Sequence, residues 1–276
     1  MSVSVRIKQK SLFKKKLNIE DIIKLINLSY GVCDENYRLI PDKIANHTLI
    51  YDKNKLARGI DISLDKTDVV LLLSLPTSSS EIRTFYEVIN KICSELKVKT
   101  YIREEEQVSL KDKKKFIKYD EEGSIKGLED LKENIMSDKY KRFEIFGIYN
   151  PISIGIKEIN EIGTSLDSLE EYLNKIQSLD VYYAAPIVYK INDNLVGIYA
   201  ISENIPSVVP LKPYIVLNQI EGISEWYVML KEGKTVKYDD FINNIDTSRY
   251  YDDNHVIVTL SEKEIDNLLN KYFSQL

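Results

Sequence analysis

Two different periods govern the apolar positions near the start of the chain. Residues 3–7 alternate between apolar and polar side chains, which predicts a strand. Residues 19–26 place isoleucine at helical intervals, which predicts a helix. Asn18 stands directly before this helix and is its expected N-cap, and the acidic side chains that follow favour the first helical turn.

The clearest pattern lies between residues 59 and 96. Residues 59–64 and 69–75 flank a short polar turn, which predicts a hairpin. Ser78 and Glu81 then have the spacing of a capping box, which predicts that a helix begins there. Its apolar residues recur every three or four positions and should pack against the hairpin: Ile82, Phe85, Tyr86, Ile89, Ile92, Cys93 and Leu96.

The rest of the chain also alternates between strand and helix patterns. Residues 97–103 should form a strand. Further helices are expected over 128–135, over 166–179 and after Ser261, where Glu264 repeats the capping-box spacing. Further strands are expected over 142–156 as a pair, 181–191, 195–201, 214–216, 226–230 and 256–260.

Charge runs with few apolar residues mark the segment 104–123. They predict an N-terminal α+β domain over 1–103, a charged linker or exposed hairpin over 104–123, and a C-terminal α+β domain over 124–276. The alternative is an exposed hairpin inside a single domain. The expected fold class is α+β, with two small mixed or antiparallel sheets that are each covered on one face by helices.

Composition and charge exclude several classes of protein. The 276 residues are 43% hydrophobic, which argues against intrinsic disorder. The first residues lack the apolar core of a secretory signal, and every apolar run is too short to span a bilayer. Cys33 and Cys93 form no C-x-x-C pair, which favours a reducing compartment. We therefore expect a cytoplasmic protein without a membrane span.

The charge balance also bears on binding partners. The chain carries 38 basic and 43 acidic side chains, a net charge of −5, which disfavours a dedicated nucleic-acid binder. The local exception is a basic stretch over residues 6–16, which we interpret as a solvated strand and turn.

Motifs for cofactors and nucleophiles are incomplete. Gly233-Lys234-Thr235 resembles the end of a phosphate-binding loop, but Val228 stands where that loop needs a glycine, so a hairpin turn is expected instead. Ser11 and Lys14 match a Ser-x-x-Lys pattern without its companion motifs. Cys93 falls on the buried helix face, and nothing near Cys33 would activate its thiol. The sequence predicts no cofactor.

Two histidines, His47 and His255, limit the acid–base chemistry that is available near neutral pH. His255 follows Asp252, Asp253 and Asn254, whose oxygens could bind a metal with it or orient its ring as a general base. A solvated turn before the last strand is the alternative that we favour, because no multi-histidine pattern supports a metal.

A resemblance concerns the segments Ala57-Arg58-Gly59-Ile60-Asp61, Leu75-Pro76-Thr77-Ser78 and Arg83-Thr84-Phe85-Tyr86. Over residues 57–96 the chain resembles a family of uncharacterised bacterial proteins of about this length. The resemblance implies a cytosolic bacterial protein. It transfers no activity and no functional residue.

Aromatic residues beyond position 180 carry the functional hypothesis. Adjacent residues of a strand face opposite sides, so one tyrosine of each pair should be exposed and available for recognition. We predict a non-enzymatic protein that binds another protein, with an enzyme whose carboxylates converge only in the fold as the alternative. The expected partner-binding residues are Tyr182, Tyr183, Trp226, Tyr227, Tyr250 and Tyr251.

Overall fold

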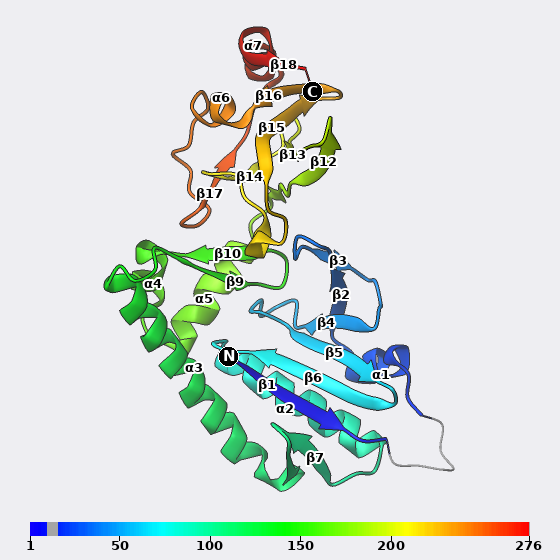
Figure 1. The fold of residues 1–276 in the computed structure, drawn as a ribbon. Helices are drawn as coiled ribbons and strands as arrows, with labels where there is room; N and C mark the ends of the chain where they lie inside the picture. The colour runs from blue at the N-terminus through cyan, green and yellow to red at the C-terminus, as the bar shows by residue number, and fades with distance from the viewer. Residues whose placement is uncertain (10–15, 276) are drawn as a thin grey trace. The chain divides into compact units, whose positions relative to one another are not determined.

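A computed structural model describes residues 1–9 and 16–275, so part of the basic stretch and the Ser11-x-x-Lys14 pattern lie outside the described residues. The chain forms two compact units, Met1–Ser178 and Leu179–Leu276, called here the N-terminal and C-terminal units (Figure 1). Each unit contains both helices and strands, which confirms the α+β class. Among the described residues, no helix combines the length and apolar character that crossing a bilayer requires.

An antiparallel sheet of eight strands organises the N-terminal unit, in the order β3-β2-β4-β5-β6-β1-β7-β8. A separate hairpin pairs β9 with β10. The strands are β1 (Ser2–Ile7), β2 (Ser29–Cys33), β3 (Leu39–Pro41), β4 (His47–Tyr51), β5 (Ile60–Asp65), β6 (Asp68–Ser74), β7 (Thr100–Arg103), β8 (Glu106–Ser109), β9 (Phe143–Phe146) and β10 (Pro151–Ile154). The helices are α1 (Ile19–Ile26), α2 (Ser79–Glu95), the 3-10 turn η1 (Leu110–Asp112), α3 (Lys113–Met136), α4 (Ile156–Ile162) and α5 (Leu166–Gln177).

Helix α2 lies along one face of this sheet (Figure 1). The alternating inward residues of β1, β5 and β6 form one core with the apolar faces of α1 and α2. The expected hairpin forms with Asp65 opposite Asp68, and the apolar helix face is buried as predicted, apart from Leu96, which is half-buried. Asn18 caps α1 with the complete capping box, because its side chain and that of Asp21 bond each other's backbone.

The start of α2 differs from the capping box that the spacing predicts. Ser78 Oγ does accept the backbone N–H of Glu81, at 3.2 Å. The Glu81 carboxylate does not return to the cap, because it accepts hydrogen bonds from the backbone of Arg58 and Gly59 and from the Thr77 hydroxyl. Only half of the motif forms at this helix.

The charged segment 104–123 lies inside the N-terminal unit. Its first residues form β8, which pairs with β7, and residues from Lys113 onward form the first half of α3. The expected helix over 128–135 is the second half of the same helix. The charge runs occupy the exposed side of a helix that buries Asp120, Ser124 and Leu128, so the division between the units differs from the predicted domain boundary.

Two sheets share one core in the C-terminal unit. A three-stranded sheet has the order β11-β14-β17, and a five-stranded sheet has the order β12-β13-β15-β16-β18. Residues of both sheets pack with α6 and α7. The elements are β11 (Tyr182–Tyr183), β12 (Ile187–Ile191), β13 (Asn194–Ala200), β14 (Ser207–Pro210), the 3-10 turn η2 (Val216–Asn218), β15 (Ile223–Lys231), β16 (Lys234–Lys237), α6 (Tyr238–Ile242), β17 (His255–Val258), α7 (Glu262–Tyr272) and β18 (Phe273–Ser274).

Two expectations about the sheets need correction. The described residues form four sheets, the largest with eight strands, and not two small ones, because strands distant in sequence pair with one another. The strand expected over 214–216 does not form, and the chain turns into η2 there. The backbone N–H of Tyr214 instead donates to the Tyr199 hydroxyl, and this hydroxyl donates to the Tyr214 C=O. The hydroxyl therefore takes the place of the backbone partners that a sheet would supply.

Candidate functional site: an open strand edge in the C-terminal unit

Residues 182–191 form the outer strand of both sheets in the C-terminal unit. β11 is the first strand of the three-stranded sheet, and β12 is the first strand of the five-stranded sheet. Only residues 184–186 separate the two strands. One continuous stretch therefore presents an edge of each sheet, and an edge strand offers backbone donors and acceptors that its own sheet does not use.

The hairpin that joins β12 to β13 fixes which backbone groups face outward. Its turn consists of Asn192 and Asp193, both with left-handed φ angles, 48° and 69°. Such a two-residue turn makes the flanking pair, Ile191 and Asn194, a hydrogen-bonded pair. Hydrogen-bonded and non-hydrogen-bonded pairs alternate along the ladder, so Val188 and Lys190 direct their N–H and C=O groups away from β13.

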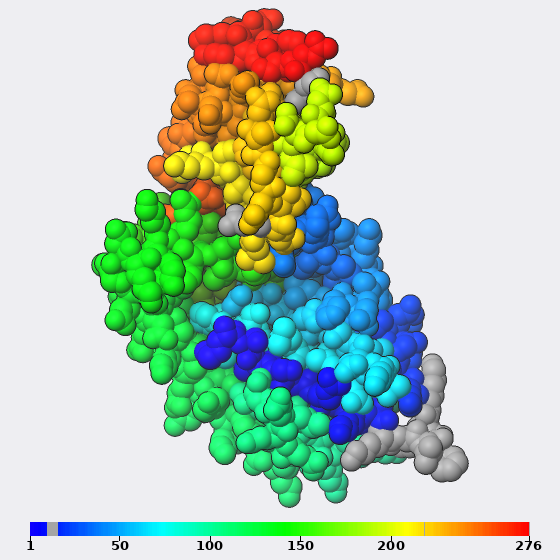
Figure 2. Space-filling view, in the orientation of Figure 1, coloured from blue at the N-terminus to red at the C-terminus, as the bar shows by residue number. Residues whose placement is uncertain are grey.

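Large, partly apolar side chains are exposed along this edge. Tyr182 is 42% exposed, Ile187 54% and Tyr189 47%. Edge strands are normally protected from other strands by charged side chains or proline. β12 carries one charge, Lys190, whose Nζ lies 2.8 Å from Asp193 Oδ1 at the turn. Figure 2 shows the yellow-green residues of this hairpin at the surface of the unit.

The structure separates the six predicted aromatic residues into two groups. Tyr182 and Tyr250 are exposed, whereas their neighbours Tyr183 and Tyr251 are each only 8% exposed. One member of each tyrosine pair therefore faces outward, as adjacent residues of an extended chain should. Accessibility to a partner is confined to Tyr182, Tyr250 and part of Trp226, since Tyr183, Tyr227 and Tyr251 are buried.

Trp226 has a packing role on the sheet. Its ring lies over Gly197 of the neighbouring strand β13, where an added Cβ would come within 2.3 Å of the indole. It also packs against Tyr199, with ring centroids 5.9 Å apart. A glycine at position 197 is therefore required for the tryptophan to lie flat, and the indole is half-buried in consequence.

His255 is the centre of a buried polar network. Its Nδ1 lies 2.7 Å from Asp252 Oδ1, and its Nε2 lies 3.1 Å from the Tyr183 hydroxyl and 3.2 Å from the Tyr214 hydroxyl. Asp252 Oδ1 also accepts the backbone N–H groups of Asn254 and His255, each at 2.9 Å. The aspartate therefore orients the imidazole ring, as its position in the sequence suggested. Its hydrogen bonds to the backbone also close a tight turn, and β17 begins directly after this turn.

This network resembles the base and orienting acid of many hydrolases, but it is closed to solvent. His255 and Asp252 are each 1% exposed. Burial raises the pKa of Tyr183 well above its usual value, and the neighbouring Tyr214 and Asp252 raise it further. A neutral tyrosine and a fixed imidazole suit a structural network that joins β11 to β17. The prediction of a solvated turn at His255 is therefore wrong, because this residue is buried.

The other residues singled out from sequence lie in ordinary structural positions. Cys93 is buried in the core, as predicted, and Gly233 forms the turn between β15 and β16. Cys33 is exposed at the end of β2, and partial desolvation together with the carboxylates of Asp34 and Asp61 raises the pKa of its thiol, which opposes thiolate formation. His47 is exposed and lies 3.2 Å from Asp61.

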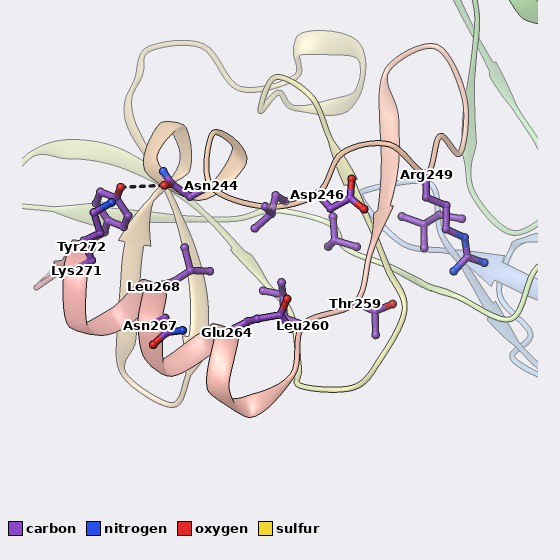
Figure 3. Close-up of a pocket in the computed structure, with 13 residues that line it drawn as sticks. Asn244, Asp246, Arg249, Thr259, Leu260, Glu264, Asn267, Leu268, Lys271 and Tyr272 are labelled. Atoms are coloured by element: carbon purple, nitrogen blue, oxygen red, sulfur yellow. Dashed lines mark hydrogen bonds between the residues drawn. The ribbon is translucent and has the colours of Figure 1, made fainter.

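A groove of about 420 Å³ lies between α7 and the loop that precedes β17 (Figure 3). Charges of both signs line it, including Asp246, Arg249, Glu264 and Lys271. Both carboxylates are used locally, because Asp246 accepts the N–H of Ser248 and Glu264 accepts the N–H of Ser261, the N-cap of α7. These bonds lower the pKa values of both groups. The groove therefore shows no preference for a ligand of one charge.

Within residues 1–9 and 16–275, no three histidine, cysteine or acidic side chains lie close enough together to hold a metal ion.

Comparison with protein families identifies the chain as a member of the family described as Domain of unknown function (DUF4299), whose model matches residues 2–268. The match confirms the resemblance of residues 57–96 to a family of unknown function. The family model itself covers nearly the whole chain. No curated protein and no solved structure matches the chain.

Proposed function

We propose that the C-terminal unit binds an extended segment of another protein, which adds a strand to the edge formed by residues 182–191. Membership of the family assigns no activity, so the proposal depends on the site. The observation that carries it is the combination, in β12, of an open edge with exposed Ile187 and Tyr189. In strand addition the backbone supplies affinity, and side chains at alternate positions supply specificity.

The charge of the C-terminal unit indicates the chemistry of this partner. Eight basic and fourteen acidic side chains give this unit a net charge of −6, whereas the N-terminal unit, with thirty basic and twenty-nine acidic side chains, carries +1. An acidic surface accelerates the approach of a basic partner and repels an acidic one. We therefore expect the bound segment to alternate apolar with basic residues.

The same charge argues against a second copy of this chain as the occupant. Two C-terminal units that paired along β12 would bring two bodies of charge −6 together, which opposes association at low ionic strength. The occupant that the site favours is a basic segment of a different protein.

A model peptide tests the proposal directly. A fluorescently labelled decapeptide of alternating valine and lysine should bind the full chain at low ionic strength, as measured by fluorescence anisotropy. Val188→Pro should weaken binding at least fivefold, because proline removes one outward N–H and leaves the β12–β13 ladder intact. Tyr189→Ala should weaken binding to a similar extent by removing exposed apolar surface.

The control variant is Tyr250→Ala, which removes a tyrosine that is 58% exposed but lies outside the edge. A peptide with all its lysines at one end controls for charge alone. The proposal is refuted if Val188→Pro and Tyr189→Ala both keep their native spectra and bind the alternating peptide as tightly as the parent. A dimer that Val188→Pro dissociates, detected by light scattering, would show instead that a second copy occupies the edge.

A further inference from the structure

The N-terminal unit carries a strongly basic surface where α3 begins. Between residues 110 and 119, five lysines stand against one acidic residue, Asp112. Four of these lysines and one tyrosine are exposed and recur at intervals of three and four residues, so they share one side of α3 and of the turn η1 that leads into it. They are called here the basic stripe: Lys111, Lys114, Lys115, Lys118 and Tyr119.

The packing of α3 fixes the direction of the basic stripe. Phe116 packs against the core of the unit and Asp120 is buried, so the stripe lies on the opposite side of the helix and faces solvent. A second segment adds positive charge beside the start of the stripe. The C=O of Lys99, just before β7, accepts the N–H of Leu110 at 3.1 Å, and both Lys97 and Lys99 are exposed (Figure 1).

Most of this lysine charge is not used inside the fold. Among the described side chains, Lys111, Lys114 and Lys115 form no ion pair with a carboxylate. Lys118 pairs with Glu122 at 3.7 Å, but both side chains are exposed, so this ion pair contributes little to stability. The ammonium groups are therefore available to an anionic ligand.

Helix stability does not explain these lysines. Lys113, Lys114 and Lys115 occupy the first turn of α3, which contains no acidic residue. Cations at this end oppose the helix dipole. Every other α-helix of the described residues has an acidic side chain in its first turn. The lysines of α3 therefore lower local stability, and a bound anion would relieve their repulsion.

The length of the basic stripe fits a nucleic-acid strand. From residue 111 to residue 119 the helix rises about 12 Å, at about 1.5 Å per residue. A stacked strand places one phosphate about every 3.4 Å, so roughly four phosphates span the same length as the four lysines. Lysine binds phosphate as a point charge without a fixed geometry, which suits contacts to the backbone of a nucleic acid.

Tyr119 favours a single strand over a duplex. Its ring is 63% exposed at the end of the stripe, and the Arg103 guanidinium lies 5.4 Å from the ring centre. An exposed aromatic ring can stack on an unpaired base, whereas the bases of a duplex already stack on one another. No exposed aliphatic side chain lies between residues 110 and 119, so the surface has no anchor for the interior of a membrane.

Acidic groups limit the stripe at its Tyr119 end. Glu104 and Glu122 line the same cavity as Tyr119. Their charge repels phosphates, so a bound strand should run from Tyr119 toward Lys111, with its phosphates beside the lysines. The net charge of −5 does not prevent this contact, because at about 0.1 M salt charges beyond roughly 10 Å are screened.

We propose that the basic stripe binds a single-stranded nucleic acid, with phosphates beside the lysines and a base stacked on Tyr119. Contacts to phosphates and to the face of a base carry little sequence information, so binding should depend weakly on sequence. The stripe belongs to the N-terminal unit, and this function is separate from that of the strand edge in the C-terminal unit.

Binding of a short fluorescent oligothymidylate to the full chain, measured by anisotropy at several salt concentrations, tests the proposal. The logarithm of the binding constant should fall against the logarithm of salt concentration with a slope of about −2 to −3, because each neutralised phosphate contributes about −0.7. Lys114→Gln with Lys115→Gln should weaken binding at least fivefold at low salt and bring the slope about 1.4 closer to zero. The matched control, Lys43→Gln with Lys53→Gln, removes two exposed lysines elsewhere in the unit and should leave binding unchanged.

Stacking has a different signature from phosphate contact. Tyr119→Ala should weaken binding at least threefold without changing the salt slope, whereas Tyr119→Phe keeps the ring and should bind like the parent. The double lysine variant should keep its thermal midpoint, because it removes charges that oppose the helix dipole.

The proposal is overturned if the double lysine variant binds like its control, if Tyr119→Ala binds as tightly as the parent, or if a duplex of the same length binds more tightly than the single strand. Binding to phosphatidylserine vesicles without binding to the oligonucleotide would show a membrane-facing surface instead. Val188→Pro should bind the oligonucleotide like the parent, so this proposal and that of the strand edge fail independently.

Discussion

Removal of the Glu81 carboxylate should destabilise the N-terminal unit severely, because three donors depend on it, two of them buried and one half-buried. The backbone N–H of Gly59 lies 2.6 Å from Oε1, the N–H of Arg58 lies 3.1 Å from the same oxygen, and the Thr77 hydroxyl lies 2.5 Å from Oε2. Glu81 is 7% exposed, so water cannot replace it without a rearrangement. These bonds join the start of β5, the residues after β6 and the first turn of α2.

The magnitude follows from the number of donors left without a partner. Each buried unsatisfied group costs about 1–3 kcal/mol, so Glu81→Ala should lower the free energy of unfolding by roughly 3–6 kcal/mol. That loss is comparable with the whole stability of many domains, which is about 5–15 kcal/mol. Glu81→Gln keeps one oxygen for the two backbone N–H groups and should cost roughly 1–2 kcal/mol.

Urea unfolding followed by circular dichroism measures these differences, with Glu87→Ala on the exposed side of the same helix as the control. The control should stay within about 0.5 kcal/mol of the parent. If Glu81→Ala and Glu87→Ala unfold at the same urea concentration, the network around Glu81 contributes no net stability, and the reasoning is refuted.

Acidity adds a second readout for the same carboxylate. Burial raises the pKa of Glu81 above its usual value of 4.5, although its hydrogen bonds and Arg58 oppose the shift. A folded-state pKa above the unfolded value means that the folded protein binds the proton more readily. The part of the stability that comes from protonation of Glu81 is therefore complete below about pH 4.5 and is lost as the pH rises through the folded-state pKa, whereas the hydrogen bonds to the side chain remain. The parent should lose stability relative to Glu81→Gln across this window.

Three further predictions concern other parts of the chain. Ile89→Asp should bury an unpaired carboxylate in the core and cost several kcal/mol in urea unfolding, whereas Asn90→Asp, on the exposed side of α2, should cost little. His255→Ala leaves the partners of a buried imidazole unsatisfied and should lower the thermal midpoint; an unchanged midpoint would mean that the network contributes nothing. Brief trypsin treatment should cleave residues 113–118 slowly, because their backbone is helical, and rapid primary cleavage there would favour a linker.

Local chemistry was sufficient to predict the elements whose residues interact over short distances. The helix from Ser79 to Glu95 was predicted from its cap and its apolar stripe, and both form. The complete capping box at Ser261 was also predicted, since its two partners are three residues apart. The β5–β6 hairpin was predicted for the same reason, because a short turn connects its strands.

The outcome at Glu81 shows where local reasoning ends. Spacing correctly placed Ser78 as the cap, but the glutamate side chain had a choice between the cap and groups more than twenty residues away. The fold brings Arg58, Gly59 and Thr77 around the carboxylate, and these residues belong to the segments on which the family resemblance depended. A tertiary network therefore overrode a motif that was locally complete.

The charged segment 104–123 shows the same limit of local patterns. Its lysines and glutamates indicate exposure, which is correct for most of them, but exposure does not distinguish a linker from the outer side of a helix. The inward positions of α3 include Asp120 and Ser124, which are polar, so the apolar stripe is incomplete in the sequence. Asp120 is buried because Arg103 and Tyr86 satisfy it, and both approach it from other elements.

The candidate site at residues 182–191 depends on the tertiary structure. The sequence alone indicated that one tyrosine of each adjacent pair should be exposed, because alternation is a local property of extended chain. It did not indicate that residues 182–191 form the edge of two sheets. A strand is an edge strand when it has a neighbour on one side only, and this depends on how all the other strands pair. Strand order and the packing of distant elements follow from the free energy of the whole fold, so no local pattern in the sequence contains them.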